Sequence, residues 1–277
     1  MPADAHPDLW TLIAISALAY ILSVALHEHG GHAVACVLLG SHPRELGAFY
    51  VDCDDSGLGS TARRLVALAG PCMSLVMGCV ALLLLRRVPP GAPATAYFTW
   101  LLGTLGLTEV GGYAAYSGVS GQGDFGTTAD GALSGASPEW LWRAVLTAVG
   151  VVLFIGAVRV SLRAIRPRLV GTDPAQLQVP RRAAYLSYFT GGATYALIGA
   201  FNPQGWAILL GSALAASLGG TSFLLWMFSH ARRYYRRYAG GTPGPGLYFP
   251  CSWGWRVAGA AVTIGYALVF ARSLRLT

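Results

Sequence analysis

The stretch LWTLIAISALAYILSVALHEHGGHAVACVLL, residues 9–39, decides how this chain folds. Residues 9–26 carry no charge, and a helix needs roughly 20 residues to cross the ~30 Å hydrocarbon core of a membrane. His27, Glu28, His29 and His32 follow directly. Because ionisable groups are expensive to bury at membrane depth, this cluster is a candidate functional site.

Composition indicates an all-α integral membrane protein, since 54% of the 277 residues are hydrophobic and only 11% are charged. Apolar runs predict six or seven transmembrane helices at about 9–39, 64–85, 96–117, 140–162, 184–201, 205–229 and 254–271. Gly191, Gly192 and Pro203 interrupt the 184–201 run. We expect a multi-pass protein of a bacterial-type cell membrane, with the lipid bilayer as a partner, no soluble domain and no nucleic acid.

Two polar segments break the helical pattern. Residues 40–61, GSHPRELGAFYVDCDDSGLGST, predict a short β-hairpin or a re-entrant loop after the first helix. The glycine-rich residues 117–138 do not resemble a spanning helix. We therefore divide the chain into a core that carries the candidate site, residues 1–138, and additional transmembrane helices, residues 139–277.

Basic residues and cysteines exclude several kinds of chemistry. All 19 basic residues are arginine, which excludes Schiff-base lysines and a P-loop lysine. Cys36, Cys72 and Cys79 fall in apolar runs, whereas Cys53 and Cys251 fall in expected loops. We interpret the cysteines as core packing and expect no disulfide framework.

The spacing within HEHGGH is typical of a metal site only if the helix departs from regular geometry. His27 and His32 are five residues apart, which is about 140° on a regular α-helix. A π-helical turn would return both rings to one side, and Gly30 and Gly31 stand where it is needed. A rival pair, His29 and His32, needs no such turn. Glu28 beside His27 is a candidate general base.

A catalytic zinc usually has three protein ligands and one open position. Asp124 in GQGDFG is the better placed candidate for the third ligand, since it follows the third span and emerges at the same side as the end of the first helix. Glu109 is the other candidate, and it could instead orient a histidine.

At these residues the chain resembles the site-2 protease family of intramembrane zinc metalloproteases. HEHGGHA at 27–33 is similar to the family's His-Glu-x-x-His with one extra residue, ARRLVALAGP at 62–71 opens the next span, and Asp124 corresponds to the third-ligand aspartate. Met73 and Ser74 stand where the family often has asparagine. The likeness covers about residues 10–130.

The resemblance implies Zn²⁺ held by His27, His32 and Asp124, with Glu28 as the general base. The substrate would be a transmembrane protein segment that unwinds beside residues 44–60 and pairs with a strand there. The sequence leaves substrate identity and oligomeric state open.

Three alternatives remain. The chain could be a catalytically inactive relative that binds membrane proteins, an ion-handling membrane protein, or a membrane zinc amidase that acts on lipids. Orientation is also open, because the arginine distribution predicts that the motif end faces away from the cytoplasm, whereas the family resemblance implies the opposite.

Overall fold

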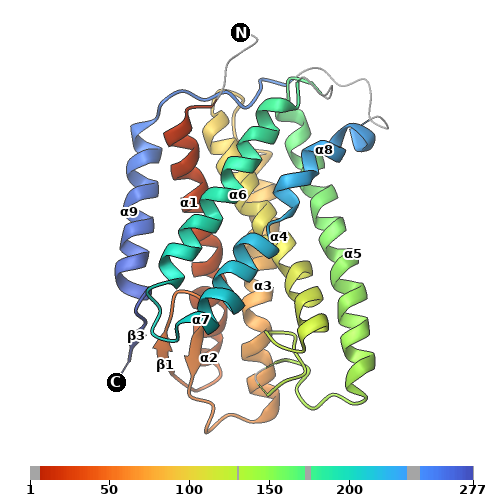
Figure 1. The fold of residues 1–277 in the computed structure, drawn as a ribbon, viewed down its shortest axis with the longest axis vertical. Coiled ribbons are helices and arrows are strands. Elements are labelled where there is room, and N and C mark those ends of the chain that lie inside the picture. Colours follow the sequence, from red (N-terminus) through yellow and green to blue (C-terminus); the bar gives the residue numbers. More distant parts are fainter. Residues whose placement is uncertain (1–6, 130, 172–175, 236–243, 277) are drawn as a thin grey trace.

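The structure is a computed structural model, which describes residues 7–129, 131–171, 176–235 and 244–276. Of residues 232–235 it describes the backbone alone. Its helices are α1 (Leu9–Ala25), the π-helix η1 (Leu26–Ala33), α2 (Val34–Leu38), α3 (Ser60–Leu85), α4 (Pro93–Ser120), α5 (Glu139–Ile165), the 3₁₀ turn η2 (Arg166–Arg168), α6 (Gln178–Gly199), α7 (Trp206–Ile208), the π-helix η3 (Leu209–Gly219), α8 (Phe223–Tyr235) and α9 (Trp253–Phe270). The strands are β1 (Pro43–Leu46), β2 (Val51–Cys53) and β3 (Leu274–Arg275). The long helices run side by side, with the sheet and α7 at one end of the bundle (Figure 1).

The described residues include four helical segments that are long and apolar enough to cross a membrane, Leu9–Leu38, Ser60–Leu85, Glu139–Arg168 and Trp206–Ala231. The chain is therefore a membrane protein by the length and composition of its helices. Helices α4, α6 and α9 pack in the same bundle but are not among the four candidate spans. The count of six or seven spans therefore stays a prediction.

The predicted hairpin is present, and it is part of a larger sheet. β1 pairs antiparallel with β2, and the C-terminal strand β3 adds to the other edge of β1, which gives the order β2-β1-β3. Strand β3 was not predicted from the sequence. Its pairing brings the end of the chain to the hairpin, and thus to the end of the first helix.

Two interpretations of the sequence were wrong. Cys36 and Cys53 form a disulfide across 17 residues, so Cys36 is not simple core packing. The 184–201 run is not interrupted at its glycines, because α6 is continuous from Gln178 to Gly199. A Cβ at Gly191 would lie against the Tyr20 ring, so this glycine lets α6 approach α1 closely.

Buried polar side chains tie the central helices together. Ser16 of α1 lies 2.8 Å from Ser187 of α6, and Tyr97 of α4 reaches the same hydroxyl at 2.7 Å. The indole N–H of fully buried Trp100 donates to the carbonyl of Ser161 on α5. Hydrogen bonds of this kind join helices in a lipid environment, where apolar packing alone discriminates poorly between partners. Through Ser187 of α6 they connect α1 with α4, which carries Glu109.

Candidate metal centre

The π-helix η1 brings His27 and His32 together, as the spacing in the sequence requires. The two Nε2 atoms lie 3.3 Å apart, and both side chains are buried. In a regular helix the five-residue spacing would separate the rings, so the extra residue per turn creates this pair. The predicted π-helical turn is thus confirmed.

The two glycines of η1 differ from each other in how closely the neighbouring helix approaches them. Neither is among the glycines with positive φ, so left-handed backbone is not the reason for them. A Cβ at Gly31 would lie 2.6 Å from Gly70 Cα, whereas one at Gly30 would meet its nearest neighbour at 3.6 Å. Gly31 is therefore needed for the close approach of η1 to α3, and Gly30 is not.

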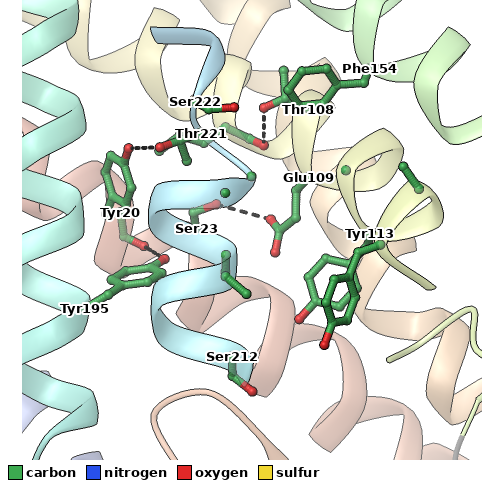
Figure 2. A pocket seen from close by; sticks show the side chains of 18 of the residues that line it. Tyr20, Ser23, Thr108, Glu109, Tyr113, Phe154, Tyr195, Ser212, Thr221 and Ser222 are labelled. Carbon is green, nitrogen blue, oxygen red and sulfur yellow. Dashed lines mark hydrogen bonds between the residues drawn. The ribbon is translucent and has the colours of Figure 1, made fainter. Parts of the chain in front are cut away.

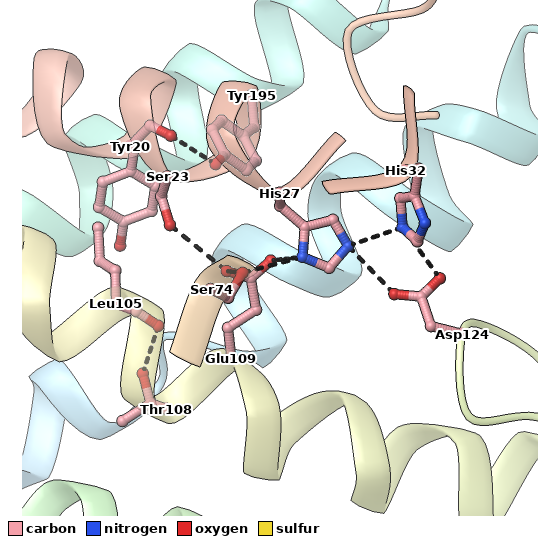
Figure 3. Close-up of polar contacts among 10 residues, drawn as sticks. All are labelled: Tyr20, Ser23, His27, His32, Ser74, Leu105, Thr108, Glu109, Asp124 and Tyr195. Carbon is pink, nitrogen blue, oxygen red and sulfur yellow. Dashed lines mark hydrogen bonds and ion pairs between the residues drawn. The ribbon is translucent and has the colours of Figure 1, made fainter. Parts of the chain in front are cut away.

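Asp124 completes the cluster from the loop that follows α4 (Figure 3). One carboxylate oxygen lies 3.1 Å from His27 Nε2 and the other 3.5 Å from His32 Nε2. The loop is anchored by the Asp124 carbonyl, which accepts from the Ala132 N–H, and by Arg64 of α3, which donates to the Ser134 carbonyl. Burial acts to raise the pKa of Asp124, but the two histidines outweigh it and lower that pKa below its ordinary value.

The outer nitrogen of each histidine has its own acceptor. His32 Nδ1 lies 2.7 Å from the Val66 carbonyl oxygen. His27 Nδ1 lies 3.0 Å from Ser74 Oγ and 3.1 Å from a Glu109 carboxylate oxygen. These contacts direct both Nε2 atoms inward, as acceptors beyond the rings do in metal sites.

Glu109 therefore lies behind His27 and outside the three-residue cluster. Its carboxylate also accepts from Ser74 at 2.9 Å and from Ser23 at 3.4 Å (Figure 3). Sequence reasoning did not identify Ser23. Ser74 was noted only as a departure from the family pattern, and the signal that could have assigned it is that a hydroxyl stands there where the family often has asparagine, another hydrogen-bonding side chain.

His29 points away from the cluster, toward α9. Its ring centroid lies 4.3 Å from that of Phe270, and Nε2 lies 3.3 Å from the Tyr266 hydroxyl. The structure therefore does not bring His29 and His32 together, and the rival register is not the one observed. Nδ1 of His29 is buried without a hydrogen-bond partner among the described residues.

Two cavities lie near the site. A cleft of about 870 Å³ is lined by Glu28, His32 and Asp124 together with strand β2, and it places the candidate base in the same space as the cluster. A second, mainly apolar cavity of about 440 Å³ is lined by Glu109 (Figure 2). Tyr113 and Ser212 line both cavities.

The donor set and its spacing fit a zinc ion. His27, His32 and Asp124 each offer one ligand atom, and these three atoms lie within 4.8 Å of one another. Two nitrogens at the usual zinc distance in a tetrahedral arrangement lie about 3.3–3.4 Å apart, which matches the 3.3 Å between the Nε2 atoms. A Cβ at Gly70 would lie 2.7 Å from His27 Nε2, so glycine keeps this space free.

Fold and site together define a helical membrane protein with a buried His-His-Asp cluster of the kind that binds a catalytic metal. Residues 8–201 match the Peptidase M50B-like family, and the chain belongs to that family. The match runs beyond residue 138, further than the motifs in the sequence indicated. M50 families are metallopeptidases of membranes and are typically zinc-dependent. No match was found among curated proteins or among solved structures.

Proposed function

We propose that this protein is a zinc metalloprotease that hydrolyses peptide bonds in or near transmembrane segments of other membrane proteins. The observation that carries the proposal is that His27, His32 and Asp124 converge at one point beside the cleft that Glu28 lines. We place it, as a multi-pass protein, in a bacterial-type cell membrane.

His27 and His32 would hold zinc through Nε2, and Asp124 through a carboxylate oxygen. The bound metal would supply Lewis-acid polarisation of the scissile carbonyl and activation of water. Glu109 and Ser74 hold the His27 ring from behind, and the Val66 carbonyl holds the His32 ring. The chain itself thus fixes both rings before any substrate arrives.

Glu28 is the residue that would move the proton. It is buried, it follows His27 directly, and it faces the cleft. As a general base it would take a proton from the attacking water and deliver it to the departing amine. Water is thereby added across the amide bond, which leaves a new carboxylate and a new amino terminus.

The cleft offers the substrate an extended path. Strand β2 forms one edge of the sheet and lines the cleft, whereas β1 is paired on both sides. A substrate segment that unwinds from its helix could therefore pair with β2, and β1 has no free edge for it. This refines the expectation that residues 44–60 receive the substrate.

The test is cleavage of a tagged transmembrane substrate in proteoliposomes, with the zinc-loaded wild type beside Glu28→Gln. We expect the wild type to cleave, and Glu28→Gln to lose about 10²–10⁴-fold in rate while keeping its zinc. Cleavage by Glu28→Gln at the wild-type rate would contradict the role of Glu28. Stoichiometric zinc without cleavage by the wild type would instead favour a catalytically inactive binding protein.

A further inference from the structure

A groove of about 690 Å³ lies between α3 and α5. Both helices pack mainly against α4 and touch one another little, so that Leu107 of α4 lies at the floor of the groove. The walls are apolar, and Leu83 of α3 and Val160 of α5 are 57% and 45% exposed. Because α3 and α5 are candidate membrane spans, these exposed side chains face lipid, and the groove opens toward the acyl chains of the bilayer.

One end of the groove is basic. It is lined there by Arg86 at the end of α3, Arg163 of α5 and Arg168 of η2. The two candidate spans end at Leu85 and at Arg168, so the three arginines stand where the hydrocarbon core gives way to the headgroups. None of the described residues that line the groove is an aspartate or a glutamate. The groove therefore combines apolar walls with a positively charged end at headgroup depth.

Arg168 closes this basic end. Its guanidinium donates to the carbonyls of Leu85 and Pro89, each at 3.1 Å, and to that of Val88. Carbonyls at the end of a helix need partners from outside it, and Arg168 supplies them for α3. It thereby fixes the α3–α4 turn, which carries Arg86, against η2. Arg86 is exposed and makes no ion pair among the described residues, so its guanidinium is available to a ligand.

The two parts of the groove suit the two parts of an anionic phospholipid. Guanidinium groups bind phosphate through paired hydrogen bonds, and basic pockets between transmembrane helices bind the headgroups of anionic lipids. A free phosphate would use the arginines and leave the apolar walls uncovered. A neutral lipid would cover the walls and leave the arginines without a counter-charge.

We propose that the groove between α3 and α5 binds one phospholipid of net negative charge, such as phosphatidylglycerol. Its phosphate would lie at Arg86 and Arg163, and an acyl chain would lie along Leu83 and Val160. The lipid would thus bridge two helices that pack on α4 and hardly on each other. The groove shares no lining residue with the cleft at the metal cluster, so neither zinc nor proteolysis enters the proposal.

Native mass spectrometry of the full-length chain in detergent measures the binding directly. With dioleoylphosphatidylglycerol as the probe we expect one lipid per chain, and we expect dioleoylphosphatidylcholine to bind more than about tenfold more weakly. Arg86→Gln should weaken binding of the anionic lipid about fivefold. Arg87→Gln is the matched control and should bind like the wild type, because Arg87 is equally exposed but does not line the groove. Equal binding of the two lipids, or an equal loss in both variants, would overturn the proposal.

Two native cysteines of α3 give a second measurement, which needs no substitution. Cys79 lines the groove and Cys72 does not, and both thiols are exposed. Dioleoylphosphatidylglycerol should slow the reaction of Cys79 with N-ethylmaleimide and leave that of Cys72 unchanged. The headgroup without acyl chains, glycerophosphoglycerol, should not protect Cys79. An unchanged Cys79 reaction in the presence of the lipid, or equal protection by the headgroup alone, would contradict a lipid site.

Discussion

Glu109 shows how a single residue behind a ligand is expected to control the site. Its carboxylate lies 3.1 Å from His27 Nδ1 and accepts from Ser74, so it fixes the His27 ring and makes Nε2 a better donor to the metal. Glu109→Gln should weaken zinc binding about 10–100-fold. Chelator competition measures the dissociation constant, with Glu139→Gln on exposed α5 as the control. An unchanged dissociation constant would contradict this role.

At this scale the sequence indicated the ligand candidates but not their partners. Three histidines and a glutamate in an apolar helix are conspicuous because burying them is costly. Asp124 was favoured over Glu109 by connectivity alone, because both lie far along the chain from His27. The structure separates them: Asp124 faces Nε2 and Glu109 faces Nδ1. Ser23 has an ordinary helical context, so no sequence signal marks its contact with Glu109.

Among the elements, the π-helix η1 depends on how closely it can approach α3. Gly31→Ala would place a Cβ 2.6 Å from Gly70 Cα, so one of the two helices must shift. We expect about 1–3 kcal/mol of destabilisation and a loss of zinc affinity. Gly30→Ala is the matched control, because its new Cβ would meet ordinary contacts at 3.6 Å. Thermal unfolding and zinc titration of both variants check this, and equal behaviour would contradict the account.

The elements differ in how far the sequence predicted them. The π-helical turn and the hairpin follow from local patterns, namely the histidine spacing and the polar stretch after the first helix. The third strand does not, because Leu274–Arg275 contains nothing that marks it as a strand before β1 is beside it. The Cys36–Cys53 bond was missed because Cys36 lies in an apolar run, where a cysteine reads as packing.

For the whole molecule, the C-terminal helix α9 supports the first helix although it lies outside the family match. A Cβ at Gly259 would lie 2.5 Å from the Ala14 carbonyl oxygen, so the two helices touch there. Gly259→Leu should push α9 away from α1 and lower the melting temperature by several degrees, as overpacking does. Gly265→Leu is the control, since a Cβ there meets nothing within 4 Å. Equal melting temperatures of the two variants would contradict this packing.

Composition established the membrane class of the whole chain, because so few of its residues are charged. It could not establish the number of spans, since α4 and α6 are long helices with glycine and polar residues that serve helix packing. The Cys36–Cys53 pairing becomes visible only when the chain is folded.

The most direct test of the central claim is the zinc content of the purified protein. We would measure it in metal-replete detergent solution for the wild type, His27→Ala, His32→Ala and Asp124→Ala, with His29→Ala as the matched histidine control. The account predicts about one zinc per chain in the wild type and in His29→Ala, and its loss in the other three variants. No zinc in the wild type, or zinc that depends on His29 and persists without His27, would contradict it.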